Sequence, residues 1–316
     1  NAPGLVEPLR CVLPTGWSLN YNRLFLGAGL ALNSLITIDR NSRVSVERRL
    51  PGSRILSRSE LAGYARGLRM HDVTGGACWH DAVMVDSERL SLAFVLGARE
   101  AGATVGNYLS AREVLSHGGR AAGLAVRDEL SGREQEITAN AVVSCQGPWG
   151  LAKDTSVLAC PDALGRVKAV NLVLPATGLA AAVGFPARDH EGRPVADRLL
   201  FAVPWQGVTM VGTWYFESED SPDDLHVTPS QLSMMLEELN SGFENWSFTA
   251  RDVRMLHIGE LPRSHLQPQP APVSRPLVAE ASRFGGLRGA WVVQGEKWTT
   301  ARATARASAP LPRPPR

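Results

Sequence analysis

The stretch that decides the fold is VVQGEKWTTAR, residues 292–302. It continues an apolar run that begins at Ala290, turns at the single glycine Gly295, and leads into an Ala/Arg segment of helical character. A glycine turn that enters a helix presents free backbone N–H groups and the positive end of the helix dipole, where negative charge is stabilised. Lys297 adds a full positive charge there. The residues alone fit both a ligand-contacting turn and an ordinary connection with a surface lysine.

A second apolar run, residues 141–145, ends at Gln146-Gly147-Pro148-Trp149. A run this short and this apolar is typical of a strand buried on both faces, as in a parallel sheet covered by helices. We therefore expect residues 141–145 and 290–293 to be strands of an α/β sheet, each followed by a glycine-containing turn.

Size and composition exclude several classes of protein. The chain has 316 residues, 44% of them hydrophobic, which is enough for a substantial core. Lys plus Arg number 33 against 31 Asp plus Glu, so nucleic acid is not an expected partner. The cysteines are too scattered for a metal site or a disulfide framework: Cys11, Cys78, Cys145 and Cys160. The first residues lack the pattern of a secretory signal, and no apolar run reaches the ~18 residues that span a bilayer.

Local patterns predict several further elements. Helices are expected from Arg23 to Thr37, after a cap at Ser59, and from Ser87 to Glu100 after a cap at Asp86. Residues 103–105 are expected to be a strand, residues 111–138 a β-meander, and residues 168–216 a separate antiparallel sheet. Thr228-Pro229-Ser230-Gln231 carries a capping box and predicts a helix over residues 229–240.

These segments resemble the FAD-dependent glycerol-3-phosphate dehydrogenases, a family of DAO-type FAD-dependent oxidoreductases. That family closes its flavin domain with a segment of the form GVKWTTAR, which Gly295, Lys297 and residues 298–302 match. Further matches follow the family's order along the chain: Pro3 to Pro14, Gly75 to Leu90, Val142 to Trp149, and Phe201 to Thr213.

The resemblance implies an α/β (α+β) fold, in which an incomplete FAD-binding Rossmann-like domain is interleaved with an antiparallel-sheet substrate domain. The implied division is a helical part of the substrate region at 1–70, the middle of the FAD-binding domain at 71–155, an antiparallel substrate domain at 156–255, a return to the FAD-binding domain at 256–308, and a disordered tail at 309–316.

The resemblance also implies the functional residues, with FAD as the cofactor and no metal. Lys297, and Arg263 as the partner of a substrate anion, are implied to be catalytic. The residues implied to contact the cofactor follow the two apolar runs: Gly147, Pro148, Trp149, Gly295, Glu296, Lys297, Trp298 and Thr299. His80 beside Asp81 is open to two interpretations, an acid–base pair or a structural histidine.

The implied reaction is oxidation of sn-glycerol 3-phosphate to dihydroxyacetone phosphate, with electrons passed to a quinone or another acceptor. The implied location is cytoplasmic, peripheral on the inner membrane. The pair Arg48-Arg49 and the tail arginines are open to two interpretations, contact with anionic lipid or an ordinary solvated face. The chain departs from the family pattern in that Leu261 stands where many relatives have arginine, and Arg263 lies two residues further on. An FAD-dependent amino-acid or hydroxy-acid oxidase therefore stays open as an alternative.

A third alternative concerns the chain itself. No GxGxxG turn for the FAD pyrophosphate occurs in the sequence, whereas family members begin with one. We therefore expect a truncated fragment that lacks roughly a hundred residues, the size of such a βαβ unit. A non-catalytic fragment of this kind would bind FAD weakly or not at all.

Overall fold

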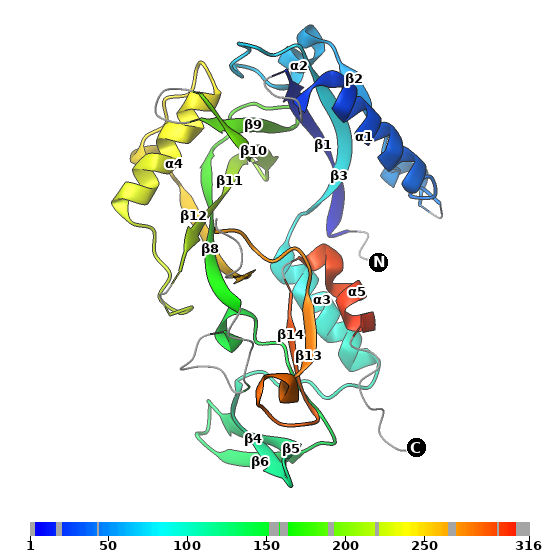
Figure 1. The fold of residues 1–316 in the computed structure, drawn as a ribbon, viewed down its shortest axis with the longest axis vertical. Coiled ribbons are helices and arrows are strands. Elements are labelled where there is room, and N and C mark those ends of the chain that lie inside the picture. Colours follow the sequence, from blue (N-terminus) through cyan, green and yellow to red (C-terminus); the bar gives the residue numbers. More distant parts are fainter. Residues whose placement is uncertain are drawn as a thin grey trace. The chain divides into compact units, whose positions relative to one another are not determined.

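The computed structural model describes residues 4–16, 21–42, 44–151, 158, 164–188, 193–218, 221–264, 270–295 and 297–307. The chain forms two compact units, whose elements are labelled in Figure 1. The large-sheet unit comprises residues 1–103, 170–214 and 227–257, and the small-sheet unit comprises residues 104–169, 215–226 and 258–316. The predicted tail at 309–316 lies outside the described residues.

An eight-stranded mixed sheet with strand order β12-β8-β11-β10-β9-β1-β3-β2 forms the frame of the large-sheet unit. Strands β8, β11 and β12 also contribute residues to the small-sheet unit. The strands are β1 (Val6–Thr15), β2 (Arg54–Leu56), β3 (Gly75–Met84), β8 (Leu164–Pro175), β9 (Ala182–Arg188), β10 (Pro194–Trp205), β11 (Val208–Glu217) and β12 (Met255–Ser264).

Two predictions for this sheet are corrected by the pairing of β1. The antiparallel strands predicted at 168–216 form, but their sheet is not separate, because β9 pairs with β1 in parallel. The segment at 1–70 predicted as the helical part of the substrate region also contains the strand β1, which pairs with β3 from Val6↔Met84 to Thr15↔Gly75. The pairing partners lie far apart in the sequence, so local patterns did not reveal them.

A tight aromatic and aliphatic core packs beneath helix α4 (Pro229–Gly242). Phe185 of β9 and Phe243 are fully buried, with ring centroids 5.2 Å apart. The helix approaches β9 so closely that a Cβ on Gly242 would lie 2.5 Å from the Phe185 ring. Under the same helix, Trp214 Nε1 donates to Glu238 Oε2 (2.7 Å), and Arg198 forms an ion pair with the same carboxylate.

Three helices test the predicted caps. Asp86 caps α3 (Ser87–Glu100) and Thr228 caps α4 with a complete capping box, so both predictions are confirmed. Helix α2 (Arg58–Tyr64) is capped by Ser57, not Ser59. The reason is Glu60: it sits three residues after Ser57, and its carboxylate accepts from the Ser57 N–H, which closes a capping box at that position.

Helix α1 (Arg23–Ile36) follows the predicted range but packs loosely. Asn22 caps it by accepting from the Phe25 N–H (2.8 Å), and none of its residues is buried. Leu24, Phe25 and Leu35 are more than half exposed. In the part of the chain that the structure describes, no helix has the length and apolar character needed to cross a membrane.

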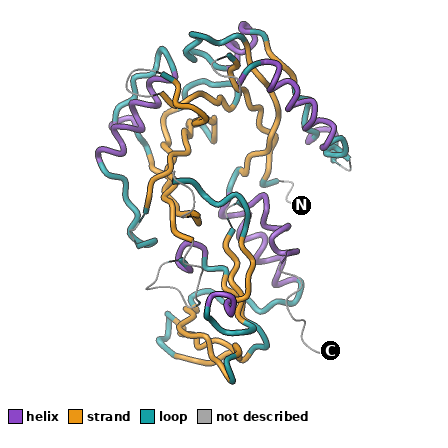
Figure 2. Tube along the Cα trace, viewed as in Figure 1, coloured by secondary structure: helices purple, strands orange, loops and turns teal. Residues whose placement is uncertain are grey.

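Two three-stranded sheets build the small-sheet unit. The predicted meander is confirmed as β4 (Leu109–His117), β5 (Arg120–Asp128) and β6 (Glu134–Thr138), which Figure 2 shows as neighbouring orange strands. The second sheet has the order β13-β14-β7, formed by β13 (Leu277–Glu280), β14 (Ala290–Gln294) and β7 (Val142–Ser144). A cluster of mostly small side chains, including Val142, Ala281 and Val292, is its core.

The strand predicted at residues 103–105 is absent from the structure, which describes that segment without regular secondary structure. The end of helix α3 explains the difference. Gly102 adopts a positive φ of 96°, and the Ala103 N–H donates to the Ala98 carbonyl (3.0 Å). The Ala103 N–H is therefore used in the hydrogen bond that ends the helix and is not available for pairing with another strand.

Candidate functional site

Two parallel strands of the small-sheet unit carry the two turns that the sequence singles out. Strands β7 (Val142–Ser144) and β14 (Ala290–Gln294) are hydrogen-bonded neighbours, with Ala290 opposite Val142 and Val292 opposite Ser144. Because the strands are parallel, their carboxyl ends lie at the same edge of the sheet. In open α/β sheets this edge is where ligands bind.

The turn after β7 is a 3-10 turn over Gly147–Gly150. Gly147 has a positive φ of 58°, a conformation that favours glycine, and no atom lies within 4 Å of the position of a Cβ. Trp149 is 42% exposed, and its indole Nε1 donates to Asp223 Oδ1 (3.0 Å). The turn thus combines an open glycine face with a tethered aromatic ring.

A buried amide joins this turn to the end of β14. Gln294 is fully buried, and its Nε2 donates to the Gly147 carbonyl (3.0 Å). Gly150 makes room for it, since a Cβ there would lie 2.9 Å from the same nitrogen. Sequence reasoning missed Gln294. An amide directly after the apolar run AWVV could have indicated a buried polar contact, because buried amides need hydrogen-bond partners.

The turn after β14 confirms the predicted order of strand, glycine and helix, with one addition. Gly295 is exposed, and no atom lies within 4 Å of where its Cβ would sit. A 3-10 turn at Trp298–Thr300 follows, held by the Thr300 N–H donating to the Lys297 carbonyl (3.1 Å), and only then does helix α5 (Ala301–Ala307) begin. Lys297 and Thr299 are exposed, Trp298 is 42% exposed, and Glu296 lies outside the described residues.

Arg263, the predicted partner of a substrate anion, lies on β12 and is already engaged by a carboxylate. Its Nη1 is 2.6 Å from Glu217 Oε1, and only 11% of its side chain is exposed. Leu261 precedes it on the same strand. The guanidinium charge is therefore shared with Glu217, so its capacity to bind a second anion is reduced.

A second carboxylate, Glu260, lies three residues before Arg263 in the sequence and is also paired with an arginine. The Glu260 side chain is fully buried, its Oε2 lies 2.8 Å from Arg166 Nη1, and its Oε1 accepts from the Ser218 hydroxyl. Removing either partner of this pair would leave an uncompensated buried charge, which is strongly destabilising. This group was not singled out from the sequence.

Comparison with known proteins gives the same family over most of the chain. The model of the FAD dependent oxidoreductase family matches residues 27–311. A glycerol-3-phosphate dehydrogenase of Synechocystis sp. is 26% identical over 278 residues, which cover 83% of this chain and 47% of that protein. The chain thus spans about half the length of this curated relative.

Solved structures share the fold. Glycerol-3-phosphate dehydrogenase from Bacillus halodurans, complexed with FAD, superposes with a TM-score of 0.72 at 21% identity, covering 98% of this chain and 52% of that one. L-proline dehydrogenase from P. horikoshii superposes with a TM-score of 0.59 at 13% identity, covering 92% of this chain and 67% of that one. The fold, the order of motifs and the family match agree, and the chain belongs to the FAD dependent oxidoreductase family.

Proposed function

We propose that this protein binds FAD against the turns that follow β7 and β14 and uses it to oxidise sn-glycerol 3-phosphate to dihydroxyacetone phosphate. The observation that carries the proposal is the pairing of β7 and β14, which brings the Gly147 and Gly295 turns to one sheet edge. The glycerol-3-phosphate dehydrogenases among the relatives support the choice of substrate.

The two turns fit a flat aromatic cofactor. Neither Gly147 nor Gly295 has an atom within 4 Å of its Cβ position, so a ring is able to approach both backbones closely. Trp149 and Trp298 present partly exposed aromatic surface beside them. Residues 147–149, Gly295 and residues 297–299 would therefore hold the ring.

The roles of this chain's own residues follow from their charge and exposure. When bound, FAD supplies the hydride acceptor for oxidation of an alcohol carbon. Lys297 is exposed and would supply positive charge to the bound ring and the substrate oxygens. Arg263 would hold the substrate phosphate only in competition with Glu217.

The proposal extends to the electron acceptor and the location. A quinone or another acceptor reoxidises the flavin, and the protein works in the cytoplasm with peripheral contact to the inner membrane. The apolar side chains exposed on α1, such as Leu24 (87%) and Leu35 (69%), suit contact with a membrane interface.

A second candidate substrate class is favoured by the state of β12. Leu261 cannot bind a phosphate, and Arg263 is paired with Glu217. An amino acid or hydroxy acid carries a single carboxylate in place of the dianionic phosphate. A carboxylate needs fewer hydrogen bonds from a guanidinium that already binds Glu217. An FAD-dependent amino-acid or hydroxy-acid oxidase of the same fold is therefore the alternative.

One experiment separates these readings. The purified protein is supplied with FAD, separated from free flavin, and inspected for flavin absorbance in the visible range. The bound flavin is then titrated without oxygen using glycerol 3-phosphate, glycerol, L-proline or glycine. We expect bleaching by glycerol 3-phosphate and not by glycerol. Bleaching by the amino acids alone would establish the alternative, and absence of bound flavin would contradict the proposal for this chain.

A further inference from the structure

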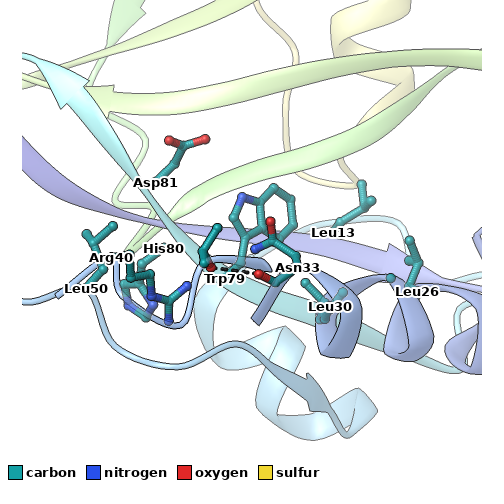
Figure 3. Close-up of a pocket in the computed structure, with 12 residues that line it drawn as sticks. Leu13, Leu26, Leu30, Asn33, Arg40, Leu50, Trp79, His80 and Asp81 are labelled. Atoms are coloured by element: carbon teal, nitrogen blue, oxygen red, sulfur yellow. Dashed lines mark hydrogen bonds between the residues drawn. The ribbon is translucent and has the colours of Figure 1, made fainter. Parts of the chain in front are cut away.

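A cavity in the large-sheet unit lies between helix α1 and strands β1 and β3. Its lining residues are distant in the sequence from the Gly147 and Gly295 turns. Its volume is about 520 Å³, which lies within the range of small-molecule sites. Figure 3 shows the side chains that line it. Helix α1 forms one wall with its half-buried side, and the sheet forms the other.

The lining changes character from one end to the other. Leu13, Leu26 and Leu30 lie together at one end, and Trp79 follows along β3 (Figure 3). The indole of Trp79 is held edge-on to Phe201, with centroids 6.4 Å apart, so it presents a fixed apolar wall. Arg40 and His80 lie at the opposite end of the cavity, beside Leu50.

The polar end is electrically suited to a negative group. Arg40 donates one Nη2 hydrogen bond to the Pro51 carbonyl (2.9 Å), which leaves further N–H donors on its guanidinium. Nδ1 of His80 is buried and has no hydrogen-bond partner within the described residues. Burial lowers the pKa of His80, and the positive charges of Arg10 and Arg40 lower it further. Asp81 also lines the cavity, but its carboxylate points away from Arg40 and His80 (Figure 3).

We propose that this cavity is a binding site for a small molecule with an apolar ring body and a carboxylate head. The ring lies against Leu26, Leu30 and Trp79, and the carboxylate meets Arg40 at the other end. His80 lines the same end of the cavity. The site involves neither FAD nor the β7 and β14 turns, so it stands independently of the proposed function.

The test uses the full chain and two probes that differ only in the head group: 2-naphthoate and the uncharged 2-naphthalenemethanol. Isothermal titration calorimetry measures the affinity of each. We expect one equivalent of naphthoate to bind about tenfold more tightly than the alcohol, the scale of one charge-assisted hydrogen bond. Equal affinity for the two probes, or no binding of either, would overturn the proposal.

Variants locate the carboxylate contact. Arg40→Gln is expected to weaken naphthoate binding about tenfold and to leave the alcohol unchanged. Arg99→Gln, an exposed arginine in the last turn of α3, is the matched control and is expected to change neither affinity. If both arginine variants weaken naphthoate equally, the attraction is a general surface effect and the assigned head-group site is wrong.

A second pair of variants separates the cavity from the exposed face of α1, which could also attract an apolar probe. Leu30→Ser removes a wall of the cavity, whereas Leu35→Ser alters an exposed leucine that does not line it. We expect only Leu30→Ser to weaken both probes, by several-fold, because apolar area is lost. The opposite result, loss with Leu35→Ser alone, would place the probe on the outer face and refute the cavity site.

Discussion

The two units differ in what their cores are made of. Beneath α4, the large-sheet unit buries Phe185, Phe243 and Trp214 completely. The β13-β14-β7 sheet of the small-sheet unit buries mainly alanine and valine, and the turns at its edge expose Gly295 and two tryptophans and leave Gly147 half-buried. The large-sheet unit therefore has a core of large aromatic side chains, whereas the core of the small-sheet unit is built from small ones.

The largest expected effect tests this contrast in stability directly. Phe185→Ala is expected to lower the free energy of unfolding by about 3–5 kcal/mol, because it leaves a cavity under α4. Val292→Ala, in the small-sheet core, should cost only about 1–2 kcal/mol, the transfer energy of the lost methyl groups. Urea denaturation measures both, with exposed Leu35→Ala as the control. Equal losses at Phe185 and Val292 would remove the distinction between the units.

The next prediction concerns activity. Lys297→Met is expected to lower kcat/KM of the flavin-loaded protein about a hundredfold with little change in stability, because an exposed charge that stabilises the reacting groups is lost. Arg306→Met, in the last turn of α5, is the control and should be close to wild type. Steady-state kinetics measures kcat/KM for both variants. An unchanged kcat/KM would show that Lys297 is a surface residue without a catalytic role.

A smaller effect is expected from the link between the two turns. Gln294→Ala leaves the Gly147 carbonyl without its donor and should cost about 1–3 kcal/mol in unfolding free energy. It should also weaken flavin binding, since the turns are no longer tied together. Gln135→Ala removes an exposed amide from β6 and serves as the control. Flavin retention equal to that of the control would show that the turns hold their position without the amide.

The smallest effect lies on the surface of the large-sheet unit. The hydrogen bond from Arg54, followed by those from Ser57, lowers the pKa of Glu60 from 4.5 to about 2. A carboxyl whose pKa is lowered by folding stabilises the fold above its unfolded value, and this contribution is lost as the pH falls from about 4.5 to about 2. Glu60→Gln should flatten the acid limb of a plot of thermal unfolding temperature against pH slightly, because the pair is exposed. A large change would show that surface charge contributes as much as the core.

Local sequence signals predicted the elements that local chemistry determines. Asp86 and Thr228 begin helices because their side chains satisfy the first free N–H groups, and that contact spans three residues. The strands β7 and β14 and their glycine turns were also predicted, since each is a short apolar run that stops at a glycine. The same local signals failed at Ser59, where Ser57 competes for Glu60.

Features that depend on contacts between distant residues could not be predicted from the sequence. The ladder between β1 and β3 needs a register across about 70 residues, which no local pattern encodes. The link that Gln294 makes between the two turns was found only when its partner carbonyl was located, and the pairing of Arg263 with Glu217 likewise required the neighbouring strands. The motifs thus found both glycine turns, but not the contacts that hold them.

The hydrogen bond between Gln294 and Gly147 joins residues 147 positions apart. Closing so long a loop carries an entropic cost, and we expect this link to form only after the strands on either side have paired. During synthesis, the Gly147 turn waits until the segment around Gln294 has left the ribosome. Flavin loading is therefore expected to follow translation of the chain, and truncation before residue 294 would abolish it.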